Sequence, residues 1–179
     1  GPHKPRLAGG AGCWSGGAGA RAVRWDLPLA ADPANSGQAG PEGSSPADGF
    51  VVPYLTKVVG AKKAREMWML CRRYSAEEAL DMGLVNAVFP LDEIWQEVDN
   101  WCEELLAKSP GCLEILKASF DQEMDGYNEM GIISSQFYPD WFDTPEGKGG
   151  GASFQANRPP RFWSIRQREA EMRQSLMDD

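Results

Sequence analysis

Apolar residues recur at helical spacing through much of the chain from residue 49 onward. The first such segment covers 49–59, and it tolerates Pro53 because this residue falls in a first helical turn. Gly60 interrupts the pattern, and residues 61–74 resume it. The spacing therefore predicts two consecutive helices.

The clearest amphipathic helix is predicted over 91–108, where most glutamates lie off an apolar stripe. Ser109 and Pro110 then supply an N-cap and a first-turn proline for a further helix. Because such stripes most often pack in a core, we expect both to be buried and assign them no chemistry. The stripes comprise Leu91, Ile94, Val98, Trp101 and Leu105 in the first helix, and Cys112 or Leu113, Leu116, Phe120 and Met124 in the second.

Two more helices are predicted towards the C-terminus. The sequence Thr144-Pro145-Glu146 is typical of a helix start, although the glycines that follow would each weaken the helix by about 1 kcal/mol relative to alanine. Residues 158–161 (RPPR) stop it. Residues 164–177 form a charged helix with a thin apolar face, suited to packing on a partner subunit. That face consists of Ile165, Met172 and Leu176.

Local cap and strand signals fill the region between these helices. Ser75 and Glu78 match a capping box, and Gly83 is suited to end the short helix in a left-handed conformation. Residues 84–90 then read as a short strand. Residues 21–31 mix strand and helix signals, and Pro28 predicts that any strand there is short or at a sheet edge.

The stretch 36–60 is the strongest candidate for chemistry. Its glycines and prolines permit tight turns and close backbone approach to a ligand. Ser44, Ser45 and Asp48 precede a helix start, whose free N–H groups favour negative charge. An ordinary surface loop is the alternative interpretation. Near the N-terminus, Gly16-Gly17 resembles a strand-to-helix turn, or else belongs to a flexible glycine-rich end.

Composition narrows the function classes. The 179 residues suit one domain, and a net charge of −8 argues against a nucleic-acid partner. No apolar run approaches the roughly 18 residues of a membrane span. The four cysteines form no C-x-x-C pair, so we expect reduced thiols in a cytoplasmic protein. His3 is the only histidine, which excludes a histidine-based triad or zinc site within the chain.

The order of these signals resembles the C-terminal part of the crotonase (enoyl-CoA hydratase/isomerase) superfamily, and most closely its 1,4-dihydroxy-2-naphthoyl-CoA synthase branch. The similarity extends over about residues 4–162 and is most specific over 49–125. It is carried by KP at 4–5, AGCWSGG at 11–17, DLPLAAD at 26–32, GQAGP at 37–41, S-x-x-DG at 45–49, the continuous segment 54–90, SPGCLEILKASF at 109–120, and the spaced TPEG…G…F…RPP from 144.

The resemblance implies an α/β fold with a crotonase-like (ClpP/crotonase) ββα spiral core, and an acyl-CoA thioester as substrate, with no tightly bound cofactor. Residues 1–90 would form the C-terminal part of the core, 91–163 a helical trimerisation region, and 164–179 a helical extension. A homotrimer or hexamer is implied. Two backbone N–H groups would hold the enolate oxygen. Gly17 matches one, and the other is expected upstream of Gly1 in the family's N-terminal part.

Individual positions refine the implied chemistry. The two hydratase glutamates fall on Ala20 and Gly40, so water addition by that pair is not expected. Gly40 matches the naphthoate synthases that use bound bicarbonate as a base, and Ser45 matches their loop serine. Their loop aspartate falls on Ala47, next to Asp48. Their C-terminal tyrosine falls on Phe142, one turn after Tyr138, while Phe154 and Arg158 are implied as CoA-binding residues.

Two alternatives follow from the departures. The aspartate of ring-opening hydrolases such as 6-oxocyclohex-1-ene-1-carbonyl-CoA hydrolase does fall on Asp48. The chain could also be a catalytically inactive crotonase-like fragment acting in oligomer assembly. At several early positions, polar residues, glycine or proline replace the family's buried apolar residues. Three explanations are open: residues 1–36 pack differently, the fragment is degenerate there, or the amino-acid sequence is imperfectly assigned. These positions are Arg6, Gly10, Ser15, Arg21, Arg24, Pro28 and Ser36.

Overall fold

The computed structural model describes residues 4–14, 25–46, 51–128 and 136–178. Within these residues the strands form two sheets of three strands each. The first sheet has the order β1-β3-β6 and is parallel throughout. In the second, β4 pairs parallel with β2 and antiparallel with β5. The strands are β1 (Leu7–Gly10), β2 (Cys13–Trp14), β3 (Leu27–Asp32), β4 (Asn35–Gly37), β5 (Arg73–Ser75) and β6 (Ala87–Pro90).

Strand β3 is the central strand of the first sheet, so the prediction that Pro28 would confine a strand to a short or edge position is wrong. Pairing with β6 begins one residue later, where Leu29 lies opposite Ala87. The Pro28 carbonyl accepts a hydrogen bond from the backbone N–H of Asn86 at 2.8 Å. An N–H at residue 28 would also point towards β6, but pairing between β3 and β6 begins only at Leu29. Proline therefore removes no hydrogen bond between these two strands.

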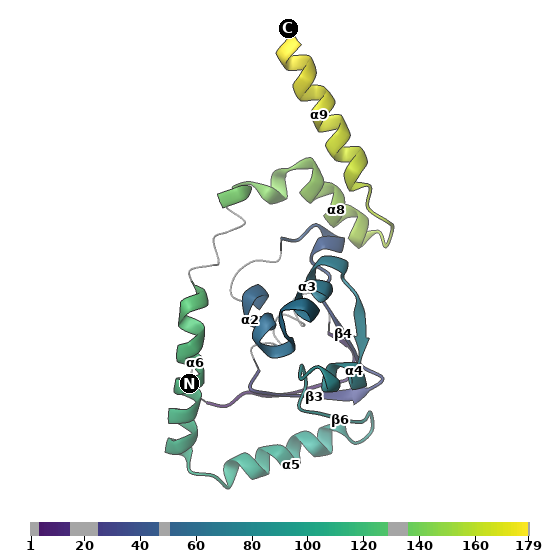
Figure 1. Ribbon diagram of the computed structural model, residues 1–179. Coiled ribbons are helices and arrows are strands. Elements are labelled where there is room, and N and C mark those ends of the chain that lie inside the picture. Colours follow the sequence, from purple (N-terminus) through teal and green to yellow (C-terminus); the bar gives the residue numbers. More distant parts are fainter. Residues whose placement is uncertain (1–3, 15–24, 47–50, 129–135, 179) are drawn as a thin grey trace.

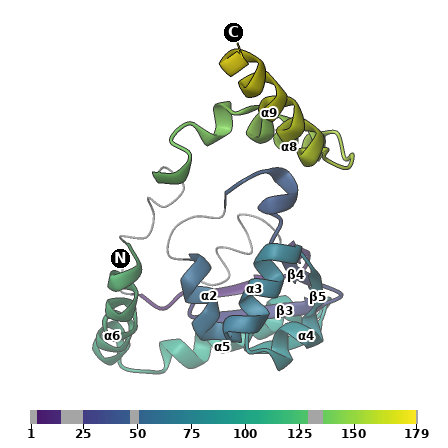
Figure 2. The same ribbon diagram turned by 45° about the horizontal axis from the view of Figure 1, so that its top comes forward.

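The helices surround the strands on several sides. In Figures 1 and 2, α2, α3 and α4 gather close to the sheets, α5 and α6 run along the periphery, and α9 projects away from the body. The helices are α2 (Val51–Val59), α3 (Ala61–Leu70), α4 (Ala76–Asp81), α5 (Ile94–Leu106), α6 (Pro110–Asn128), α8 (Pro145–Gln155) and α9 (Phe162–Asp178), with 3-10 turns η1 (Pro41–Gly43) and η3 (Trp141–Asp143).

The break between the first two helices is confirmed at Gly60, which has a φ of +82°. The second of them, α3, ends at Leu70, so its predicted extension to residue 74 is wrong. Cys71 adopts a left-handed conformation with a φ of +52° and turns the chain out of the helix. The following residues pair with β4, which buries Tyr74 opposite Ser36.

The predicted capping box forms at the start of α4. The backbone N–H of Glu78 donates to Ser75 Oγ at 3.1 Å, and the backbone N–H of Ser75 donates to Glu78 Oε2 at 2.8 Å. Gly83 follows the helix with a φ of +74°, as expected for a left-handed cap. The predicted strand after it is confirmed as β6. These short-range signals determine the local structure because their partners are only a few residues apart.

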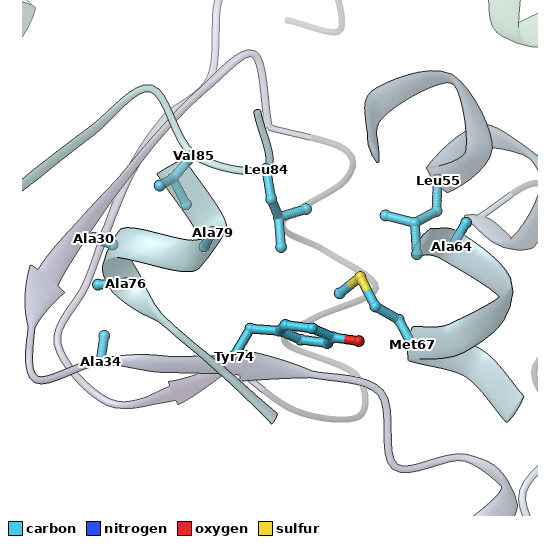
Figure 3. Packing of buried hydrophobic residues seen from close by; sticks show 10 residues of the cluster. All are labelled: Ala30, Ala34, Leu55, Ala64, Met67, Tyr74, Ala76, Ala79, Leu84 and Val85. Carbon is cyan, nitrogen blue, oxygen red and sulfur yellow. The ribbon is translucent and has the colours of Figure 1, made fainter. Parts of the chain in front are cut away.

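Two clusters of buried side chains lie on opposite sides of β3. In the first, Leu55, Ala64 and Met67 of α2 and α3 face Tyr74 and Leu84 (Figure 3). The second joins Leu29 and Ala31 to Ile94 of α5. Because alternate residues of a strand point to opposite faces, Ala30 enters the first cluster and its neighbours the second. Both faces of β3 are therefore covered.

The stripe predicted over 91–108 is buried in part, since Ile94 of α5 is 0% exposed and Leu91, which precedes the helix, is 49% exposed. The expectation of a buried stripe on α6 is wrong for this chain taken alone, since Leu116 and Phe120 are 52% and 68% exposed. Among residues 110–122 of α6, whose burial the structure describes, the buried residue is instead Lys117.

Lys117 and Asp26 join α6 to the strands. Lys117 Nζ lies 3.1 Å from Asp26 Oδ1 and also pairs with Asp121 of its own helix. Asp26 Oδ2 accepts the backbone N–H of Arg6 at 2.7 Å. Burial acts to lower the pKa of Lys117, but the hydrogen bonds to Asp121 and Asp26 act in the opposite direction and raise it overall. The ammonium group is therefore held charged in a nearly buried position.

The structure describes some of the replacements near the N-terminus, and their polar groups are not all paired. The Arg6 side chain is exposed, so no arginine charge is buried there. Gly10 is half-buried, and Ser36 is buried with its hydroxyl unpaired among the described residues. Ser15, Arg21 and Arg24 lie outside the described residues.

In the part of the chain that the structure describes, no helix combines the length and apolarity needed to cross a membrane. The division at residues 90 and 163 into core, trimerisation region and extension stays a prediction.

Candidate functional site

Residues 38–45, here called the site loop, fold tightly around the carbonyl of Gly40. This carbonyl accepts the backbone N–H groups of Gly43 at 3.1 Å and Ser45 at 2.9 Å. Ser44 adopts a left-handed conformation with a φ of +55°, which reverses the chain between them. Ser45 is exposed and Gly40 is half-buried. The turn therefore fixes two predicted site residues next to each other.

Helix α8 covers the end of the site loop. The Ser44 hydroxyl donates to the Glu146 carbonyl at 3.0 Å, and Ser44 is only 5% exposed. A Cβ on Gly150 would lie 2.1 Å from Ser44 Cβ, so this position of α8 accepts no side chain without a shift. In Figure 1 the dark blue turn of η1 lies against α8. The glycines that weaken this helix therefore allow it to approach the loop.

The start of α8 is built as the sequence predicts. Thr144 caps the helix, since its hydroxyl accepts the backbone N–H of Gly147 at 3.0 Å. Gly147 also permits a close approach, because a Cβ there would meet the Trp141 carbonyl at 2.3 Å. The helix ends at Gln155, before the predicted stop at RPPR.

Tyr138 is connected to the site loop through Trp141. The two rings form an edge-to-face pair with centroids 5.2 Å apart and an interplanar angle of 68°. The Trp141 indole N–H donates to the Ser44 carbonyl at 2.7 Å. Tyr138 keeps 45% of its surface exposed. Tyr138 is therefore joined to Ser44 through the side chain of Trp141.

The predicted CoA-binding residues lie at the far end of α8. The Phe154 ring lies 3.5 Å from the position a Cβ would take on Gly43, and 57% of Phe154 is exposed. Arg158 follows the helix with an exposed side chain, and its backbone N–H donates to the Ser153 carbonyl at 3.0 Å. An exposed aromatic ring thus lies against the site loop, and an exposed arginine follows the end of α8.

The structure brings together Gly40, Ser45, Tyr138 and Phe154 around the loop and α8. Gly17 and Asp48 lie outside the described residues, so their predicted positions in the same cleft stay predictions. Phe142, which the resemblance matches to the synthase tyrosine, is 67% exposed.

Three buried polar atoms were not identified from the sequence. Ser36 Oγ, Gln38 Oε1 and Trp68 Nε1 have no hydrogen-bond partner among the described residues. Buried polar groups are normally paired, so each of these atoms calls for a ligand, a water molecule or another part of the chain. Gln38 belongs to the GQAGP motif, which was the one sequence signal for it. Burial itself could not be seen in the sequence.

No group of three or more His, Cys, Asp or Glu side chains within the described ranges could hold a metal ion. A groove of about 780 Å³ lies between α8 and α9, lined by Pro145, Gly149, Ile165, Arg168 and Met172 among others. None of the predicted site residues lines this groove. It is therefore separate from the site loop.

The arrangement described above is a mixed α/β fold of the crotonase type. The chain belongs to the enoyl-CoA hydratase/isomerase family, whose model matches residues 4–165. This result confirms the superfamily and the fold class expected from the sequence.

Solved structures agree with this assignment. An enoyl-CoA hydratase from Mycobacterium avium subsp. paratuberculosis K-10 is 28% identical with a TM-score of 0.79, over 89% of this chain and 65% of that one. An enoyl-CoA hydratase/carnithine racemase from Magnetospirillum magneticum is 26% identical with a TM-score of 0.64, over 89% and 60%. A methylmalonyl-CoA decarboxylase in complex with 2-nitronate-propionyl-CoA shares the fold, at 19% identity and a TM-score of 0.80, over 89% and 63%. The chain thus spans less than two thirds of the length of these proteins.

Proposed function

We propose that the protein acts on an acyl-CoA thioester and makes or breaks a C–C bond through a thioester enolate, as the 1,4-dihydroxy-2-naphthoyl-CoA synthases do. The observation that carries this proposal is the site loop itself. Gly40 and Ser45 are held in one tight turn, with Tyr138 connected to it through Trp141. This turn belongs to a chain of the enoyl-CoA hydratase/isomerase family.

In this proposal the backbone N–H of Gly17 stabilises the negative charge that develops on the thioester oxygen. A preorganised donor of this kind contributes about 3–4 kcal/mol to transition-state stabilisation. Ser45 and Tyr138 donate hydrogen bonds to further oxygens of the substrate, and Asp48 holds or moves a proton. Phe154 and Arg158 bind the coenzyme A portion by stacking and by charge.

The base that removes the proton next to the thioester is proposed to be bound bicarbonate, because Gly40 offers no carboxylate. Gln38 Oε1, which has no hydrogen-bond partner among the described residues, supports a polar ligand near this turn, because Gln38 is buried and precedes Gly40 by two residues. A bicarbonate O–H would satisfy this acceptor. Trp68 Nε1 is another buried polar atom, a donor, that has no hydrogen-bond partner among the described residues.

A homotrimer or hexamer is also proposed. The large exposed apolar side chains of α6 support it, because Leu116 and Phe120 would be covered by a neighbouring subunit. The same surface supports the alternative of a catalytically inactive assembly subunit. The ring-opening hydrolase remains the second catalytic candidate, because Asp48 matches its aspartate.

The branch is tested by incubating the protein with o-succinylbenzoyl-CoA in bicarbonate-free buffer and after addition of bicarbonate. The proposal predicts a naphthoyl-CoA product that depends on bicarbonate. Product formation without bicarbonate would show that bicarbonate is not the base. Turnover of a ring-ketone thioester in place of o-succinylbenzoyl-CoA would favour the hydrolase.

A further inference from the structure

The guanidinium of Arg73 connects the site loop to the end of α3. Its Nη1 donates to the Gln38 carbonyl at 3.3 Å and to the Cys71 carbonyl at 2.7 Å. Its Nη2 donates to Glu42 Oε2 at 2.9 Å. Arg73 therefore contacts the loop at two points, one before and one after Gly40.

The surrounding backbone is shaped for this side chain. Gly37 lies opposite Arg73 in the antiparallel pair of β4 and β5. A Cβ on Gly37 would lie 2.9 Å from Arg73 Cδ and 2.7 Å from the Arg72 carbonyl, so a side chain there would displace Arg73. Cys71, in its left-handed conformation, presents one of the free carbonyls at the end of α3 to the guanidinium.

The contacts of Arg73 complement those of α8. The end of the loop is held at Ser44, whose hydroxyl donates to the Glu146 carbonyl of α8 and whose carbonyl accepts the indole N–H of Trp141 in η3. Arg73 holds the beginning of the loop, at Gln38 and Glu42. The Gly40 carbonyl, which accepts the Ser45 N–H, lies in the sequence between the two loop residues that Arg73 contacts.

We propose that Arg73 is a positioning residue that fixes the shape of the site loop and thereby the direction of Ser45. The catalytic part of this inference rests on the proposed function. The ion pair itself is partly exposed, with 37% of the Arg73 side chain and 48% of Glu42 accessible. Pairs at such exposure add little to the free energy of unfolding. Its main effect is therefore on the loop rather than on the stability of the whole chain.

Arg72 provides a matched control. It is adjacent in sequence and has the same chemistry, but it pairs with Glu66 at 3.3 Å and its side chain is 60% exposed. Replacing Arg72 by Gln removes an equal charge without touching the site loop. Arg73→Gln, Arg73→Lys and Glu42→Gln separate the contributions of the carbonyl contacts, the charge and the carboxylate.

The experiment measures backbone amide exchange in the protein, the melting temperature, and kcat and KM with o-succinylbenzoyl-CoA. Arg73→Gln is expected to accelerate exchange at Gly43 and Ser45 by about tenfold or more, because local opening of the loop becomes easier. It is expected to lower kcat by about tenfold while KM changes less, a split that a merely structural role would not give. The melting temperature should stay within about 3 °C of the wild type.

The variants extend this test. Arg73→Lys should restore part of kcat, because a lysine can still reach a carbonyl or Glu42 but cannot make the forked contact. Glu42→Gln should have a smaller effect than Arg73→Gln, because both carbonyl contacts remain. Arg72→Gln should leave exchange in the loop and kcat unchanged.

Three outcomes would overturn the inference. One is unchanged exchange at Gly43 and Ser45 in Arg73→Gln. Another is an equal change in Arg72→Gln. A third is faster exchange with unchanged kcat in an active enzyme. If the wild type turns over no thioester, the proposed function fails on that observation alone. The exchange data then decide by themselves whether Arg73 holds the loop.

Discussion

Gly150 of α8 lies against Ser44 of the site loop so closely that a Cβ on the glycine would stand 2.1 Å from the serine Cβ. The same Cβ would lie 2.8 Å from the Phe162 ring of α9. Gly150 lowers the intrinsic stability of α8, but it also allows the helix to pack directly against the site loop. Helix stability and loop placement are set by the same position.

Gly150→Ala is therefore expected to destabilise the protein by about 1–3 kcal/mol, because the added methyl group forces α8 and Ser44 apart. Gly151→Ala is the control, since no atom lies within 4 Å of its would-be Cβ. It should stabilise the protein by up to about 1 kcal/mol through helix propensity. Urea unfolding of both variants measures the difference. Equal stability of the two variants would contradict the described packing.

Lys117→Met is expected to lower the free energy of unfolding by about 1–3 kcal/mol, because Asp26 loses a charged partner in a partly buried position. The Lys117 side chain is 8% exposed and that of Asp26 is 25% exposed. Lys148→Met is the matched control, since its pair with Asp143 has exposures of 63% and 80%. It should change stability by less than about 0.5 kcal/mol. Similar losses in both variants would show that burial of the pair is unimportant.

The phenol of Tyr74 should lose its proton at a higher pH than an ordinary tyrosine does. Burial, and then the hydrogen bond that its hydroxyl donates to Glu66 Oε1 at 2.8 Å, raise its pKa from 10.0 to about 12. A raised folded-state pKa contributes stability that is fully present below pH 10 and is lost as pH rises towards 12. The same hydrogen bond lowers the pKa of Glu66.

Ultraviolet titration of phenolate formation should therefore resolve a late component in the folded wild type. Tyr74→Phe should lack this component and should also lose less stability between pH 10 and 12. A late component of the same size in Tyr74→Phe would assign it to another tyrosine.

The capping box of α4 offers a test with two adjacent glutamates. Glu78→Ala removes the acceptor of the Ser75 N–H and should cost about 1 kcal/mol of stability. Glu77→Ala removes a similar charge from the same first turn, but Glu77 makes no part of the box. Its cost should be smaller, about 0.3–0.5 kcal/mol from the helix dipole. Thermal unfolding measures the stability of the two variants. An equal loss of stability would show that the Glu78 side chain contributes only through its charge.

The capping box illustrates what the sequence could predict. Ser75, Glu78 and Gly83 interact with residues a few positions away, so their pattern is sufficient to define the local structure. The Thr144 cap is a second example. Where partners are local, prediction from the chain alone succeeds.

Features set by distant partners were predicted wrongly or missed. Pro28 is tolerated in the central strand because β6 begins to pair one residue later, which no local pattern reveals. The end of α3 at Leu70 depends on pairing with β4, some 35 residues away along the chain. Leu116 and Phe120 of the α6 stripe are exposed, and within residues 110–122 the residue packed inward is Lys117.

The candidate site divides in the same way. The resemblance to a family identified Gly40, Ser45, Tyr138 and Phe154 as positions, but their proximity depends on the tertiary contact between the loop and α8. Arg73 and the unpaired Gln38 were not singled out, because neither burial nor contact with a distant carbonyl leaves a sequence pattern.

We propose that the site loop belongs to a cleft that stabilises a thioester enolate. Mixing the protein with acetoacetyl-CoA and recording the enolate absorbance measures this stabilisation. We expect enolate formation in the wild type, a reduced amplitude in Ser45→Ala, and an unchanged amplitude in the exposed control Ser164→Ala. Absence of the enolate signal in the wild type, or an equal signal in Ser45→Ala, would contradict it.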